Sequence, residues 1–74
     1  FGFMSHAPTA PHHGRNLKRI REILGVKQDA LAVVLGVSQQ AVSQLEQKET
    51  LDEIILNKAA KALGVPEEAL RNFS

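Results

Sequence analysis

Four glutamines are concentrated within the nine residues 39–47, and that stretch contains no lysine or arginine. A glutamine amide carries a donor and an acceptor, so it can bond N6 and N7 of adenine together in the major groove of DNA. On a helix, the polar side chains of this stretch would share one face, namely Gln39, Gln40, Ser43, Gln44 and Gln47. This face predicts reading of DNA bases, and the alternative interpretation is an ordinary solvated helix surface.

An apolar stripe in the same stretch predicts that it folds as a helix. Val42 and Leu45 are spaced as on the buried side of an amphipathic helix. Ser38 is a favoured N-cap residue, and Val37 and Val42 occupy the N′ and N4 positions of a hydrophobic staple. We therefore expect a helix over 39–47.

The preceding segment predicts another helix that meets this one at a tight turn. Leu31, Ala32 and Leu35 would face inward from a helix over 28–35. Gly36 then stops the helix, because glycine accepts a positive φ that a Cβ would resist. Two helices joined by a short turn that contains glycine form a helix-turn-helix.

Hydrophobic periodicity predicts three further helices around this pair, and hence an all-α domain of five helices. The first of the five would end at Gly25. Thr50 and Glu53 fit a capping box that would open the fourth helix, and Gly64 would close it. Pro66 suits the first position of a short fifth helix.

With these features the chain resembles the Cro/CI-type helix-turn-helix repressors, also called the xenobiotic-response-element family, over about residues 15–72. The residues that carry the resemblance are Gln28, Leu31, Ala32, Leu35, Gly36, Val37, Ser38, Val42, Leu45 and Glu46, followed by 58–65. The resemblance implies a lambda-repressor-like domain that binds double-stranded DNA sequence-specifically as a transcriptional regulator, chiefly a repressor. It also implies a homodimer that places helix 39–47 of each copy in the major groove.

The side-chain chemistry and the resemblance together assign roles to individual residues. Base reading falls to Gln39, Gln40, Ser43 and Gln44. Phosphate contacts fall to Arg15, Lys27, Gln28, Gln47 and Lys48. Gln28 is also expected to brace Gln39 in the manner of the resembling repressors. Arg21 and Glu46 match a structural ion pair that joins the first helix to the third.

Two positions depart from the family pattern. Lys27 stands where an N-cap is expected, and because lysine cannot cap, the helix end is weaker by about 1 kcal/mol. A phosphate contact by Lys27 would compensate for this loss. The link after Glu46 lacks glycine and is shorter than usual, which argues against phosphate contacts by its backbone. Lys48 remains a candidate for a side-chain phosphate contact, which the negative charge of Glu49 would oppose.

Basic residues are concentrated in the first part of the predicted domain. Between 15 and 27 there are five of them against one acid, Glu22, although the net charge of the chain is only +1. The five are Arg15, Lys18, Arg19, Arg21 and Lys27. Such an asymmetry is typical of a phosphate-binding surface, and the alternative is a solvated basic helix face.

Residues 1–14 contain no Lys, Arg, Asp or Glu and no hydrophobic period, so we expect a flexible arm ahead of a domain over 15–74. The first three residues of the arm are a candidate cloning remnant. His6, His12 and His13 could hold a metal ion, but no cysteine or carboxylate accompanies them. We therefore expect a polar arm and no metal.

The composition argues against several classes of protein. The chain has no cysteine, no glycine-rich phosphate loop and no grouped nucleophile and base, so we expect no enzyme, cofactor or small-molecule ligand. No apolar run approaches the roughly 18 residues of a membrane span, and no leader peptide is recognised. These features predict a cytoplasmic protein, and the resemblance implies one of bacterial or phage type, associated with the nucleoid.

A second class of function stays open at this point. The stretch from Glu46 to the end holds six acids and four bases, which suits an antitoxin or a protein-interaction module with weak or nonspecific DNA binding. The dimer surface is expected around Leu70 and Phe73.

Overall fold

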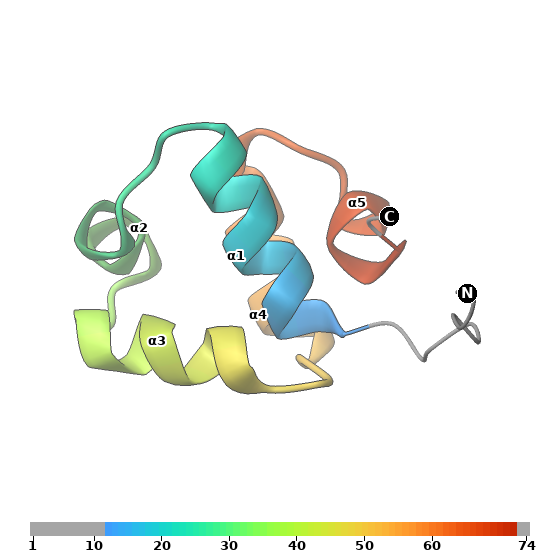
Figure 1. Ribbon diagram of the computed structural model, residues 1–74, viewed down its shortest axis with the longest axis horizontal. Helices are drawn as coiled ribbons and strands as arrows, with labels where there is room; N and C mark the ends of the chain where they lie inside the picture. The colour runs from blue at the N-terminus through green and yellow to red at the C-terminus, as the bar shows by residue number, and fades with distance from the viewer. Residues whose placement is uncertain (1–11, 73–74) are drawn as a thin grey trace, which may run out of the picture.

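The computed structural model describes residues 12–72, and these residues form five α-helices and no strand. The helices are α1 (His13–Ile23), α2 (Gln28–Leu35), α3 (Gln39–Gln47), α4 (Glu53–Leu63) and α5 (Glu67–Asn72). In Figure 1, α1 and α4 cross the middle of the domain, with α2 and α3 towards one end and α5 at the other. The predicted all-α class and the predicted bounds of α2 and α3 are confirmed.

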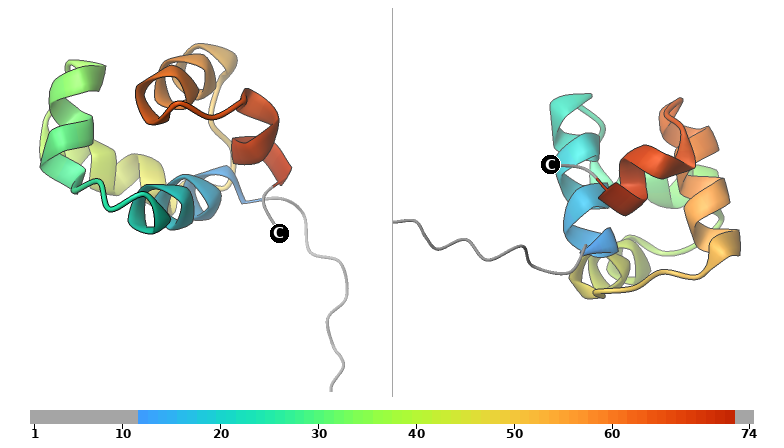
Figure 2. Two further views of the ribbon diagram at one scale, coloured as in Figure 1. Left: turned by 90° about the horizontal axis from the view of Figure 1, so that it is seen from above. Right: turned by 90° about the vertical axis from the view of Figure 1, so that its right-hand side faces the viewer.

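One fully buried side chain from each helix contributes to a single core. These side chains are Leu17, Leu31, Val42, Leu56 and Leu70. The helix α1 packs against α3, α4 and α5, and α2 packs against α3 and α4, as the views of Figure 2 allow the reader to follow. Burial of each such side chain stabilises the fold by roughly 1.5–3 kcal/mol, so every helix is fixed to the others by its own apolar contact.

Leu70, one of the two residues around which a dimer surface is expected, cannot itself contribute a side chain to it. The side chain of Leu70 is 0% exposed and lies in the core, so it is unavailable to a second copy. Its backbone carbonyl is also engaged, because it accepts a hydrogen bond of 2.7 Å from Nδ2 of the buried Asn16. Phe73, the other residue of that prediction, lies outside the described residues.

The turn between α2 and α3 has the predicted backbone. Gly36 has a φ of +74°, and the following N–H, that of Val37, donates to the carbonyl of Ala32 at 3.0 Å. The left-handed conformation of Gly36 thus lets the N–H of Val37 bond a carbonyl that the end of α2 would otherwise leave without a partner. The hydroxyl of Ser38 then accepts from the N–H of Ala41 at 3.0 Å and caps α3.

The helix α1 begins earlier than the sequence predicts. His12 is its N-cap, with Nδ1 accepting from the N–H of Arg15 at 2.9 Å. The predicted arm over 1–14 is therefore wrong for residues 12–14, which belong to the folded domain. Histidine is not among the favoured N-cap residues, so nothing in the local sequence pointed to this start. Residues 1–11, including His6, lie outside the described part of the chain.

The start of α1 is bonded to the link between α3 and α4. The N–H groups of His13 and Gly14 donate to the carbonyls of Glu49 and Lys48, at 2.8 and 2.9 Å. In the opposite direction, the N–H of Leu51 donates to Nδ1 of His13 at 3.0 Å. These three bonds hold the first turn of α1 against the link between α3 and α4.

We predict that Gly14→Ala destabilises the domain. A Cβ at this position would lie 2.5 Å from the carbonyl oxygen of Leu45 and 2.6 Å from the carbonyl carbon of Glu46, so the backbones of α1 and α3 would have to separate. Overpacking of this kind costs about 1–3 kcal/mol. Urea denaturation measures the loss, with Lys18→Ala, on the exposed side of α1, as the control. Equal unfolding midpoints for the two variants would contradict the close approach.

The helix α4 starts at a different residue from the one predicted. Its N-cap is Asp52, whose Oδ1 accepts from the N–H of Ile55 at 2.8 Å, and Thr50 has no capping role. The capping box of Thr50 and Glu53 would require helical backbone from Leu51 onward. Leu51 instead buries its side chain and gives its N–H to His13, which delays the helix.

We predict that Asp52→Ala lowers the free energy of unfolding by about 1 kcal/mol, because the first turn of α4 loses its cap. Thr50→Ala, on the same link, is the matched control and should leave stability within about 0.5 kcal/mol of the parent chain. Thermal unfolding of both variants measures the difference. A larger loss of stability in Thr50→Ala than in Asp52→Ala would instead support the capping box of Thr50 and Glu53.

Candidate nucleic-acid interface

The outer side of α3 presents the glutamines of the sequence pattern together. Gln39, Gln40, Gln44 and Gln47 are exposed and Ser43 is half-buried, while Val42 on the opposite side is 0% exposed. Figure 1 shows α3 along the lower edge of the domain, where this side is not covered by another helix. We call these five residues the polar face of α3. The structure therefore places all the predicted base-reading side chains on one accessible helix.

The first residue of the polar face is held by a residue of α2. The Nε2 atom of Gln39 donates to Oε1 of Gln28 at 3.3 Å, so the expected brace between these two side chains is present. Gln28 is the first residue of α2, and the bond brings the N-terminal ends of α2 and α3 together. The brace positions a base-reading candidate beside a phosphate-contact candidate.

A buried ion pair lies beneath this brace. The Nε atom of Arg21 donates to Oε2 of Glu46 at 2.6 Å, and Nη2 donates to Oε1 at 3.3 Å. The two side chains are only 9% and 4% exposed. Arg21 also donates through Nη1 to the carbonyl of Val26 at 2.8 Å. The predicted pair between α1 and α3 is confirmed, and it also fixes the chain at the end of α1.

The carboxylate of Glu46 has a further partner that the sequence did not reveal. The Nε2 atom of Gln28 donates to Oε1 of Glu46 at 2.8 Å. Gln28 and Glu46 are 18 residues apart, and only the crossing of α2 and α3 brings them together. No buried side-chain nitrogen or oxygen within residues 12–72 is left without a hydrogen-bond partner.

The phosphate candidates lie at both ends of α3. Lys27 and Gln28 are at the start of α2, beside the first turn of α3, whereas Gln47 is the last residue of α3 and Lys48 is its C-cap. The N-cap position at Lys27 has no side-chain hydrogen bond, so N–H groups of the first turn of α2 point outward without a side-chain cap. Free N–H groups at a helix N-terminus suit an anion.

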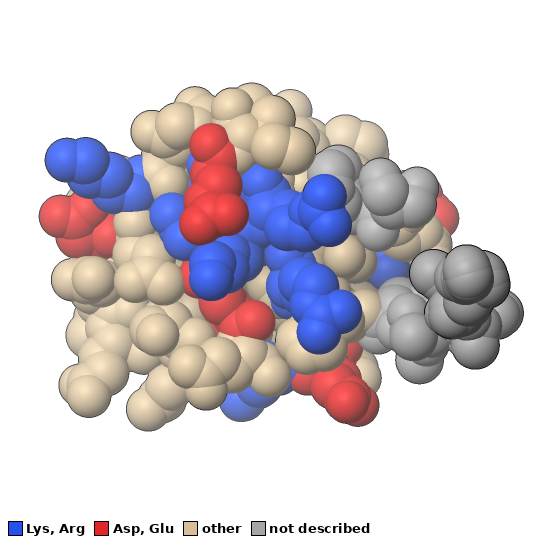
Figure 3. All heavy atoms as spheres, in the orientation of Figure 1, with Lys and Arg blue, Asp and Glu red and all other residues tan. Residues whose placement is uncertain are grey.

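Three further basic residues of the first part of the domain lie on α1 rather than on α3. Arg15, Lys18 and Arg19 are all exposed there. Figure 3 shows lysine and arginine side chains gathered over α1, whereas the lower left of this view, over the N-terminal end of α3, is mostly tan and uncharged. Of the predicted phosphate contacts, Arg15 is therefore the one that lies on α1, directly after Gly14, whose N–H donates to the carbonyl of Lys48 at 2.9 Å.

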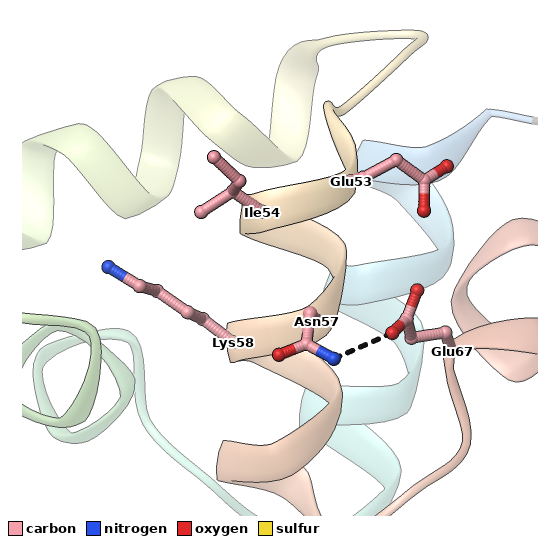
Figure 4. A pocket seen from close by; sticks show the side chains of 5 residues that line it. All are labelled: Glu53, Ile54, Asn57, Lys58 and Glu67. Atoms are coloured by element: carbon pink, nitrogen blue, oxygen red, sulfur yellow. Dashed lines mark hydrogen bonds between the residues drawn. The ribbon is translucent and has the colours of Figure 1, made fainter.

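A shallow hollow over α4 and the start of α5 is lined by Glu53, Ile54, Asn57, Lys58 and Glu67, as Figure 4 shows. Asn57 donates to Glu67 at 2.7 Å, and this bond, assisted by Arg71, lowers the pKa of the Glu67 carboxyl. The ion pair of Arg71 with Glu53 is the main cause that raises the pKa of the guanidinium. These contacts tie α5 to α4 at the surface.

Within 12–72, no group of three or more His, Cys, Asp or Glu side chains could hold a metal ion. None of the helices described is both long and apolar enough to cross a membrane.

Comparison with known proteins agrees with this geometry. A family profile described as helix-turn-helix matches residues 17–70 of the chain. The chain belongs to the Cro/CI-type helix-turn-helix family. Membership of this family supports DNA-binding transcription regulation as its activity. A comparison with curated proteins gives no match.

Two solved structures resemble the domain. The restriction-modification controller protein C.AhdI from Aeromonas hydrophila superposes with a TM-score of 0.71 and is 25% identical, over 80% of this chain and 91% of that one. FeII HppE, solved in complex with its substrate, gives a TM-score of 0.75 and 29% identity over 86% of this chain. The second match covers only 37% of the HppE chain, so this helix-turn-helix chain resembles one part of that protein.

We predict that Arg21→Ala or Glu46→Ala lowers the free energy of unfolding by about 3–5 kcal/mol, because either change leaves the other charge buried without its partner. The double variant Arg21→Met with Glu46→Leu removes both charges and should recover much of the loss. Urea denaturation of all three variants measures these effects. A double variant less stable than both single variants would contradict the ion-pair explanation.

Proposed function

We propose that this helix-turn-helix domain binds a specific DNA operator as a homodimer, acts as a transcriptional repressor and has no catalytic activity of its own. The observation that carries the proposal is the polar face of α3, which is accessible along its length and is braced at Gln39 by Gln28. Such a helix fits the major groove, which is wide enough to admit an α-helix.

Base reading is assigned to the part of α3 nearest its N-terminus. Gln39 and Gln40 stand in the first turn, the end that a recognition helix inserts most deeply, and Ser43 and Gln44 stand one turn further on. Glutamine bonds adenine through N6 and N7, and each good bidentate pair contributes about 1–3 kcal/mol of discrimination. The proposed operator is therefore rich in A·T pairs at the positions that these glutamines reach.

Phosphate binding is assigned to the two ends of the same helix. Lys27, Gln28 and the uncapped N–H groups of α2 would contact one strand, and Gln47 and Lys48 the other. The nine residues of α3 span about 13 Å at 1.5 Å per residue, which is close to the width of the major groove. Arg15 would reach a phosphate from the first turn of α1.

The proposal of a homodimer follows from the size of the domain. One copy of α3 covers a single half-site, and proteins of this class bind two half-sites about one helical turn apart. Likeness to the controller protein C.AhdI supports a regulatory role on DNA.

Exposed apolar side chains favour a second candidate function. Val33 and Val34 on α2 are 79% and 65% exposed, which suits a protein partner better than DNA. An antitoxin or another protein-interaction module of the same fold would use such a surface and would bind DNA weakly or without sequence preference.

Selection of binding sites from random duplex DNA, at a stated salt concentration, distinguishes the two candidates. We expect a two-fold symmetric motif, whose preference at one base pair per half-site is lost in Gln40→Ala. Lys48→Ala is the matched control, because loss of a phosphate contact should weaken all sequences alike and reduce the salt dependence. Failure to enrich any motif would contradict operator binding and favour the interaction module.

A further inference from the structure

A continuous hydrogen-bonded path leads from the buried ion pair to the polar face of α3. Arg21 donates to Glu46 at 2.6 Å, Gln28 donates to Glu46 at 2.8 Å, and Gln39 donates to Gln28 at 3.3 Å. The exposure of the side chains rises along this path, from the buried pair through the half-buried Gln28 to the exposed Gln39. We call these four residues the relay.

The direction of every bond in the relay is determined by the carboxylate. An ionised carboxylate only accepts hydrogen bonds, so Gln28 must turn its NH₂ group inward to Glu46. The Oε1 atom of Gln28 then points outward, and it too can only accept, so Gln39 must offer its NH₂ group. This leaves Gln39 with Oε1 and one N–H to present to a base.

We propose that Glu46, a buried residue of the inner side of α3, selects the base read by Gln39 by setting the direction of its amide. The proposal rests on the operator binding proposed above. With its amide direction set, Gln39 offers one acceptor and one donor, the combination that adenine N6 and N7 complement. An amide free to turn could also donate twice to guanine, whose O6 and N7 both accept. Glu46 is thus a positioning residue for specificity.

The substitution Glu46→Gln reverses the relay with little change in shape. The short bond from Nε of Arg21 requires an oxygen at the Oε2 position, so the new NH₂ group falls at the Oε1 position, where it faces Gln28 and gives up only the longer, 3.3 Å bond from Nη2 of Arg21. Gln28 must then turn its oxygen inward and its NH₂ group outward. Gln39 would accept through Oε1 and present its two N–H donors to the groove.

The experiment compares binding of the parent chain and of Glu46→Gln to the selected operator and to its single-base variants. We expect Glu46→Gln to lose about tenfold of the preference for adenine over guanine at the base pair read by Gln39, within the range of one bidentate contact. Preferences at the positions read by Gln40 and Gln44 should remain. A loss of stability alone would weaken all sequences equally, so the position-specific change is the decisive readout.

Gln28→Leu keeps the inference testable if Glu46→Gln does not fold. It interrupts the relay outside the Arg21–Glu46 pair, and it should lower the same preference in addition to a uniform loss from the phosphate contact. Gln47→Ala is the control, because it removes a predicted phosphate contact outside the relay and should lower affinity without changing base preference.

The outcomes separate this inference from the proposed function. If the parent chain shows no sequence preference, operator binding is contradicted and the inference falls with it. If the parent chain selects an operator and folded Glu46→Gln, or Gln28→Leu, keeps the full preference at that base pair, the inference alone is overturned.

Discussion

Burial of a single charge without a partner destabilises a fold far more than burial of a guanidinium paired with a carboxylate. In this chain the two groups are Arg21 and Glu46, and they join α1 to α3 at the point where α2 crosses. Around the pair, Val26 is held in the link between α1 and α2, and Gln28 at the start of α2. The orientation of the helix-turn-helix relative to α1 therefore depends on one ion pair as well as on apolar packing.

Much of the fold could be predicted from the sequence because its signals are local. Gly36 and Ser38 define the turn between α2 and α3 through their own backbone and side-chain bonds, and both were recognised. The start of α1 could not be predicted because histidine, here His12, is an unusual N-cap and because His13 is held by contacts with distant residues, such as that with Leu51. The same contact explains why Asp52 caps α4 in place of the expected residue.

The candidate site divides in the same way. The grouping of the glutamines on one face follows from helical spacing, and the pairings of Arg21 with Glu46 and of Gln28 with Gln39 were implied by the family resemblance. The bond from Gln28 to Glu46 could not be predicted, because it depends on how closely α2 and α3 cross. Leu70 was wrongly assigned to a dimer surface because an apolar residue near a chain end has the same sequence pattern whether it packs on its own core or on a partner.

The brace between Gln28 and Gln39 has a consequence for how binding specificity can change. Gln40 and Gln44 are exposed, and no bond ties either of them to a base-reading neighbour among the contacts described above. A single substitution at either position can therefore change base preference without a compensating substitution elsewhere. Gln39 shares a hydrogen bond with α2, so a new residue there must suit Gln28 or be accompanied by a second substitution. Divergence towards new operators should thus proceed by single steps along most of α3 and by paired steps at its first residue.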